Sequence, residues 1–174
     1  MTTSKSLSNR ALENAALRKT YDTIERSVLL LIILPLPVFG FVYLYSQRRL
    51  FEINLPVVPD WTEPVLFGLV LILLGYQALG YSRAIKGLLA AGLILEERMK
   101  RYGSATVFRF WMLFTSALLS ALGLLLFDHA IFTVAFALTL VFISAGKPTP
   151  DRIVRILKLK GEEKEAVMDL RRRG

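Results

Sequence analysis

Two residue types that support much of protein chemistry are scarce in this chain of 174 residues: it has no cysteine and a single histidine. Without cysteine the chain forms no disulfide, no cysteine-ligated zinc site and no iron–sulfur cluster, and it has no thiol nucleophile. The lone His129 argues against histidine-ligated haem and against a metal site built from several histidines. We therefore expect neither a metal centre nor a cofactor.

Charged residues are also missing from four long stretches, each of 17 to 21 residues. A helix crosses the hydrocarbon core of a bilayer with about 20 apolar residues, and a backbone in lipid has to satisfy its own hydrogen bonds, which a helix does. The pattern predicts an all-α protein, a bundle of four transmembrane helices with short amphipathic cytoplasmic helices. The four expected spans are 27–47, 64–82, 110–127 and 130–146.

The lysines and arginines outside these stretches are distributed unequally between the two expected sides of the membrane, and this inequality predicts the orientation of the protein. Of the 22 lysines and arginines, 20 fall on the side that holds both ends of the chain and the stretch between the second and third spans. Cytoplasmic loops carry such an excess, so both termini should be cytoplasmic. The expected organisation is an N-terminal cytoplasmic helix at 1–26, a membrane domain at 27–146 with a cytoplasmic linker at 83–109, and basic C-terminal helices at 147–174.

The cytoplasmic cations are the candidate contact residues. Near an anionic leaflet they attract lipid headgroups, and they also suit an acidic protein partner. The plainer reading is that they only orient the protein. Nucleic acid is not expected, because these charges lack interleaved aromatics. The residues in question are Arg83, Lys86, Arg98, Lys100, Arg101, Arg109, Arg152, Arg155 and Lys158.

Prolines and glycines mark two of the spans. Pro35 and Pro37 remove backbone hydrogen bonds and predict a kink, which improves packing or, on the alternative reading, opens a substrate site. Gly68 and Gly75 are seven residues apart and share a helix face, which favours an internal packing seam over a dimer interface. Near Lys147, the sequence Thr149-Pro150-Asp151 predicts the start of a short helix.

At the opposite end, Asp128 and His129 form a short connection between the third and fourth spans, and Asp60 and Glu63 are expected on the same side. A histidine near carboxylates suits metal binding or pH sensing. A polar turn without further role is the preferred interpretation.

The chain also resembles itself when it is shifted by 69 residues. Arg83, Leu88, Gly92 and Met99 then fall on arginine, leucine, glycine and methionine again. Either a duplication or a shared amphipathic composition explains the match.

The pattern from Pro148 to Met168, which follows a membrane hairpin, resembles the tail of small bacterial four-helix integral membrane proteins. The resemblance covers about the second half of the chain. It implies a bacterial inner-membrane setting and carries no known activity.

Ionisable residues inside spans usually mark ion paths, and the four spans contain none. This argues against a proton-coupled carrier and leaves transport of a neutral solute open. No nucleophile, metal cluster or acid–base pair indicates an enzyme. We therefore expect a non-enzymatic accessory, assembly or interaction protein that contacts anionic lipid, with a protein partner or a second copy of the chain. The alternative is a small oligomeric transporter or channel that depends on Gln77 or on the Pro35/Pro37 segment.

Overall fold

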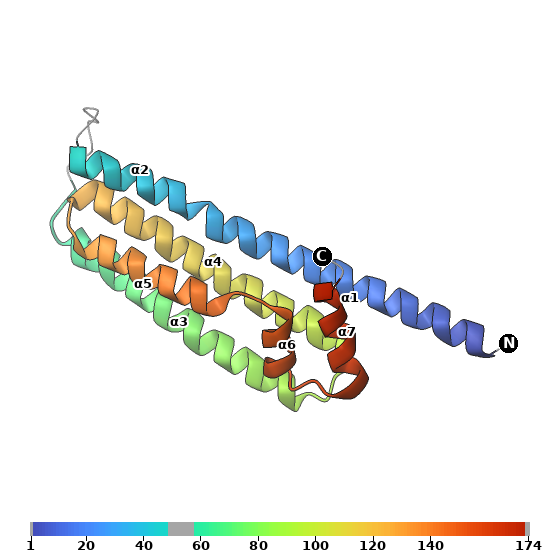
Figure 1. Ribbon diagram of the computed structural model, residues 1–174. Coiled ribbons are helices and arrows are strands. Elements are labelled where there is room, and N and C mark those ends of the chain that lie inside the picture. The colour runs from blue at the N-terminus through green and yellow to red at the C-terminus, as the bar shows by residue number, and fades with distance from the viewer. Residues whose placement is uncertain (1, 49–57, 173–174) are drawn as a thin grey trace. The chain divides into compact units, whose positions relative to one another are not determined.

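The computed structural model describes residues 2–48 and 58–172, and every regular element among them is a helix (Figure 1). The prediction of an all-α protein is therefore confirmed. The helices, in chain order, are α1 (Thr2–Ile33), α2 (Pro35–Arg48), α3 (Thr62–Ala90), α4 (Leu95–Phe127), α5 (Ile131–Gly146), α6 (Pro150–Ile156) and α7 (Gly161–Arg172).

The first two helices are separated by one residue. Leu34 lies between them, and its backbone N–H still donates to the carbonyl oxygen of Leu30 at 3.1 Å. Pro35, which has no N–H to donate, begins α2. The interruption therefore falls directly before the first of the two prolines, and Arg18–Gln47 forms one run of 30 residues.

Three helical runs are long and apolar enough to cross a membrane: Arg18–Gln47, Thr62–Ala90 and Leu95–Phe127. A fourth depends on α5, which has only 16 residues and is followed by α6 after a bend of 80°. The structure thus supports a membrane protein with three or four such helices. The expected count of four rests on whether α5 crosses.

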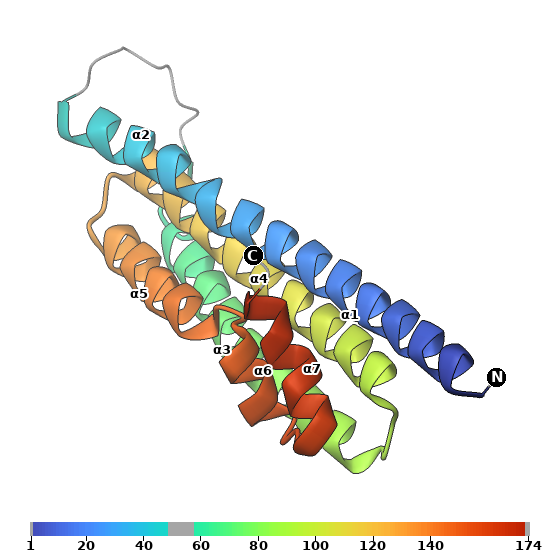
Figure 2. The same cartoon turned by 45° about the vertical axis from the view of Figure 1, so that its right-hand side comes forward.

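The chain forms two compact units. Unit 1 comprises Met1–Ser27, Tyr81–Val107 and Pro148–Gly174, and unit 2 comprises Val28–Gly80 and Phe108–Lys147. Three segments that are distant in sequence thus fold together in unit 1, where α6 and α7 lie beside each other (Figure 2).

Unit 2 has its own apolar core, to which α2, α3, α4 and α5 all contribute. The rings of Phe39 and Phe136 stack in this core with centroids 3.7 Å apart. Phe132 is fully buried and lies so close to Gly123 that a Cβ at that glycine would meet its ring at 2.2 Å. The short connection between α4 and α5 therefore produces a tight antiparallel contact that only glycine permits at this position.

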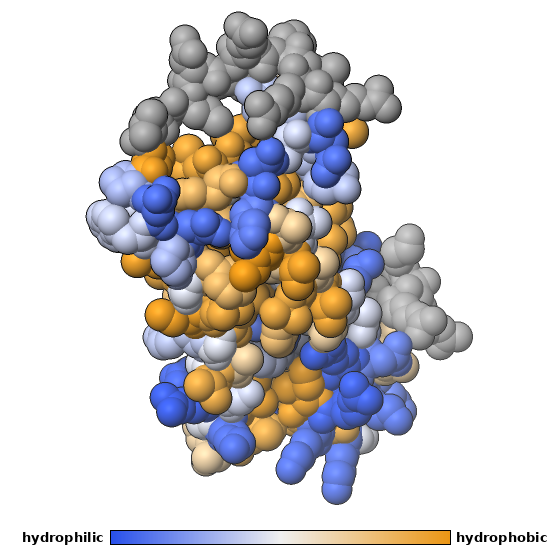
Figure 3. All heavy atoms as spheres, turned by 90° about the vertical axis from the view of Figure 1, so that its left-hand side faces the viewer, coloured by the Kyte–Doolittle hydropathy of each residue, from blue (hydrophilic) through white to orange (hydrophobic). Residues whose placement is uncertain are grey.

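Large apolar side chains are exposed mainly on unit 2. Among the described residues, all those with high exposure except Leu89 and Ile94 belong to this unit. Apolar side chains also cover much of the face drawn in Figure 3. A soluble protein rarely exposes so much apolar surface, whereas lipid solvates it without cost.

Two turns in unit 1 depend on glycine. An apolar stripe from Ile85 to Met99 in the sequence predicts that the second span continues past Ser82 as a cytoplasmic helix. This prediction is wrong in one respect: α3 ends at Ala90, and Gly92 adopts a left-handed conformation with φ +60° before α4 begins. Gly161, its counterpart under the 69-residue shift, has φ +53°. Both φ values favour glycine, because a Cβ is strained there.

Candidate functional site

The basic surface of unit 1 is held by a core that draws on five helices. Tyr21 of α1, Leu88 of α3, Tyr102 of α4, Ile153 of α6 and Val167 of α7 are all buried in it. Burying apolar side chains stabilises the folded unit by about 25 cal/mol per Å² of surface removed from water. The charged side chains of these helices therefore lie on a folded scaffold rather than on loose tails.

Arg98 is the most constrained of the predicted contact residues in unit 1. Its Nη2 donates to Oε1 of Glu163 at 2.9 Å, and its Nε donates to the backbone oxygen of Leu93 at 2.7 Å. The pair is partly buried and joins α4 to α7. This arginine therefore has a structural role in unit 1 and is less available to a partner.

Lys100 and Arg101 form two equivalent pairs on α4. Lys100 Nζ lies 2.7 Å from Glu96 Oε1, and Arg101 Nη2 lies 3.0 Å from Glu97 Oε1, each at a spacing of four residues. Both cations remain about 60% exposed. Surface pairs of this kind are weak, so a stronger anion can displace the glutamate.

The remaining predicted contact residues of unit 1 lie on α3, on α6 and just after α6. Arg83, Lys86, Arg155 and Lys158 are exposed, and Arg152 is half-buried. These side chains form the part of the predicted surface that is open to lipid or to a protein.

Arg109 differs from the other predicted contact residues because it is only 8% exposed and belongs to unit 2. Its Nη2 donates to the backbone oxygen of Phe142 at 3.4 Å, and a Cβ at Gly146 would lie 3.3 Å from its Cζ. A cation at the carboxyl end of α5 satisfies late carbonyls and complements the helix dipole. The structure thus places Arg109 against α5, and we leave it out of the proposed contact surface.

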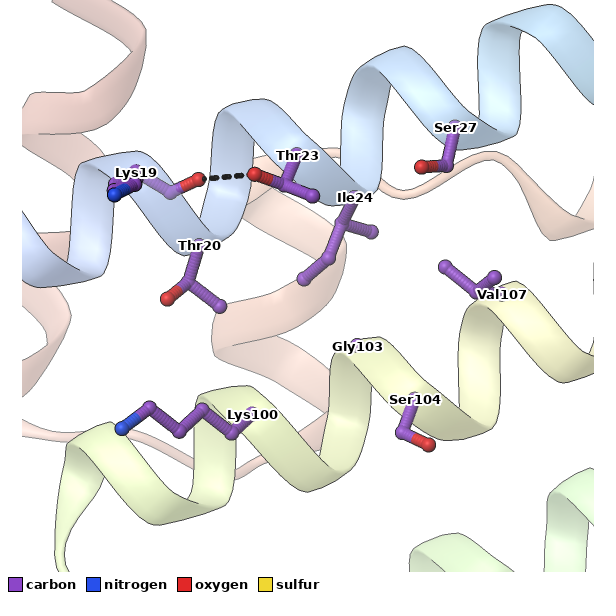
Figure 4. A pocket seen from close by; sticks show the side chains of 9 residues that line it. All are labelled: Lys19, Thr20, Thr23, Ile24, Ser27, Lys100, Gly103, Ser104 and Val107. Atoms are coloured by element: carbon purple, nitrogen blue, oxygen red, sulfur yellow. Dashed lines mark hydrogen bonds between the residues drawn. The ribbon is translucent and has the colours of Figure 1, made fainter.

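Sequence reasoning did not identify a groove between α1 and α4 in unit 1 (Figure 4). Its volume is about 480 Å³. Thr20 and Ile24 point from α1 toward α4. The nine lining residues are Lys19, Thr20, Thr23, Ile24, Ser27, Lys100, Gly103, Ser104 and Val107.

The sequence did contain a signal for this groove. Lys19, Thr23 and Ser27 recur every four residues, which places them on one face of α1, and Lys100 and Ser104 repeat that spacing on α4. What the spacing does not reveal is that the two polar rows line the same groove.

Unit 2 contains a buried amide within the second expected span. Gln77 is 2% exposed, and neither its Oε1 nor its Nε2 has a hydrogen-bond partner among the described residues. The buried hydroxyls of Ser116, Ser120 and Thr139 instead donate to backbone oxygens four residues earlier in their own helices. Gln77 is thus the buried polar side chain of this span that most needs an explanation.

At the end of unit 2 that contains the connection from α4 to α5, two polar contacts form. His129 Nδ1 lies 2.7 Å from Glu63 Oε1, and Ser46 donates to Asp128. Asp128 has φ +50°, a conformation that aspartate tolerates better than most residues. No group of three or more histidine and carboxylate side chains suited to a metal occurs in the described ranges 2–48 and 58–172.

Three comparisons, with protein-family models, with curated proteins and with solved structures, found no match to the chain. They therefore assign no family. The implication of the resemblance noted for the C-terminal pattern stays a prediction.

Proposed function

We propose that the chain is an integral membrane protein that crosses the bilayer four times with both ends in the cytoplasm, in a bacterial inner membrane. We further propose that unit 1 presents basic helices at the inner surface as a non-enzymatic accessory, assembly or interaction surface. The observation that carries this proposal is that unit 1 is assembled from three separate segments of the chain. All three segments adjoin expected spans, and they share one apolar core.

Segments that share a core lie on the same side of a membrane. The chain between Ser27 and Tyr81 therefore crosses an even number of times, and so does the chain between Val107 and Pro148. The first stretch supplies two crossings through the Arg18–Gln47 run and α3. The boundaries between the units also fall within about two residues of the span ends expected from charge.

The same reasoning requires α5 to cross. Because α4 carries the chain away from unit 1, α5 has to return it before Pro148. With 16 residues it is about 24 Å long, shorter than a hydrocarbon core of about 30 Å. Local thinning of the bilayer accommodates such a mismatch at modest cost.

The test combines topology with partner capture. A tag at either end should be accessible from the cytoplasm only, and mild-detergent purification of the native protein should recover a stable partner. Reversing charge with Lys86→Glu and Arg155→Glu should release that partner, whereas Lys164→Glu, an exposed change on α7 outside the predicted set, should not. Ends found on opposite faces, or a chain recovered alone at every expression level, would refute the proposal.

The buried amide of Gln77 supports the second candidate, an oligomeric transporter or channel for a neutral solute. An amide that finds no partner among the described residues is a suitable hydrogen-bonding group for a passing polar molecule. In liposomes, Gln77→Leu should abolish solute flux, while the exposed control Gln47→Leu should leave it unchanged. Flux that survives Gln77→Leu, or no flux for any neutral solute in the unaltered protein, removes this candidate.

A further inference from the structure

We propose that the groove between α1 and α4 binds one anionic phospholipid of the cytoplasmic leaflet. Its phosphate lies between Lys19 and Lys100, and one acyl chain leaves the groove beside Val107. This site rests on the proposed topology, because only then does unit 1 face the anionic inner leaflet.

Charge complementarity is the first argument. The only charged residues among the nine that line the groove are Lys19 and Lys100, and no carboxylate lines it. Among the described residues, the ammonium group of Lys19 has no ion-pair partner. The groove therefore offers the unpaired positive charge of Lys19, and the hydroxyl of Ser104 in its lining is a hydrogen-bond donor suited to a phosphate.

Lys100 does have a competing partner in Glu96, at 2.7 Å. That pair is exposed, and exposed pairs between flexible side chains are weak. A phosphate that contacts two lysines at once should displace the single carboxylate. The neighbouring Arg101–Glu97 pair has the same spacing and similar exposure but does not line the groove, so it provides a matched control.

The apolar wall distinguishes a lipid from a soluble anion. Ile24, Gly103 and Val107 line the groove between the polar groups. A Cβ at Gly103 would meet Ile24 Cδ1 at 2.3 Å, so glycine allows the close approach of α1 and α4 that forms this wall. Free phosphate gains nothing from such a surface, whereas an acyl chain does.

The position of the groove along the chain fits a lipid that enters from the bilayer. Lys19 and Ser27 are eight residues apart, which is about 12 Å along a helix. The headgroup layer on each side of a bilayer is about 5–7 Å thick. Ser27 and Val107 are followed directly by the first residues of unit 2 in α1 and α4, where the apolar spans begin. The groove is thus long enough for a headgroup and the first methylenes of one chain.

Native mass spectrometry of the full-length protein in a neutral detergent tests the proposal. Dioctanoyl-phosphatidylglycerol should bind with a stoichiometry of one per chain, and dioctanoyl-phosphatidylcholine and inorganic phosphate should compete poorly. Each of Lys19→Gln and Lys100→Gln should weaken binding by about fivefold, and the double variant by about 25-fold. Arg101→Gln should change the dissociation constant by less than about twofold, because this side chain lies outside the groove.

A second variant probes the wall without altering charge. Val107→Trp should block the groove and reduce phosphatidylglycerol binding while both lysines remain. The proposal is overturned if the double lysine variant binds like the unaltered protein, if Arg101→Gln is equally damaging, or if inorganic phosphate competes as well as the lipid. If lipid binding fails while cytoplasmic ends and the co-purifying partner are retained, only the lipid site is wrong and the proposed function stands.

Discussion

Replacing Gln77 by leucine should stabilise the protein, which is unusual for a substitution at a side chain that is 2% exposed. Both polar atoms of its amide are buried without a partner among the described residues. A buried polar group left unsatisfied costs about 1–3 kcal/mol, and leucine fills a similar volume without that cost. We expect Gln77→Leu to raise the free energy of unfolding by about 1–3 kcal/mol.

The assay is reversible unfolding in mixed micelles, followed by circular dichroism as denaturing detergent is added. Gln47→Leu is the control: it makes the same chemical change at an exposed position of α2 and should shift the unfolding free energy by less than about 0.5 kcal/mol. Hydrogen bonds between polar side chains in membrane interiors contribute about 0.6 kcal/mol on average. If Gln77→Leu destabilises the protein while Gln47→Leu does not, the amide has a hydrogen-bond partner, and the unsatisfied amide that supports the transport alternative does not exist.

Two further pairs of variants test the packing described above. Gly123→Ala brings a Cβ to 2.2 Å from the ring of Phe132 and should destabilise the protein by about 1–3 kcal/mol in the same unfolding assay. Gly75→Ala, the control, meets nothing within 4 Å and should be neutral or stabilising by up to about 1 kcal/mol. Equal effects of the two variants would contradict the contact between α4 and α5. Arg98→Gln removes a partly buried ion pair between α4 and α7, so it should lower the unfolding free energy of unit 1 by about 1 kcal/mol and speed proteolysis of α7. Arg101→Gln breaks an exposed ion pair and should have neither effect. Unchanged proteolysis in Arg98→Gln would show that α7 is held by its apolar contacts alone.

Much of the fold was accessible from the sequence because the features that define it are local. Hydropathy and helix periodicity predicted the apolar runs, and α6 begins at Pro150 with Thr149 at the N-cap position, as its sequence indicates. The end of α3 was placed too late, since the weight of one glycine, Gly92, was underestimated against a continuing apolar stripe. The face shared by Gly68 and Gly75 was expected to pack internally, yet a Cβ at either would meet nothing within 4 Å.

The candidate site was less accessible. The cationic contact residues were predicted from their positions near the expected spans, and such a linear reading treats all arginines alike. Arg109 is buried against α5, and Arg98 is committed to α7, whereas Lys19, which had not been singled out, lines the groove. These differences depend on which helix lies opposite each side chain, and no local pattern encodes that.

The sequence by itself determined that this chain has stretches suited to lipid and that most of its positive charge lies in the segments that flank them, because transfer of each residue into hydrocarbon depends on that residue and its immediate neighbours. Tertiary structure alone decided that three distant segments share the core of unit 1, that Gly103 brings α1 and α4 together, and that Gln77 is buried. Those outcomes require contacts between residues far apart in the chain, which form only when the helices pack.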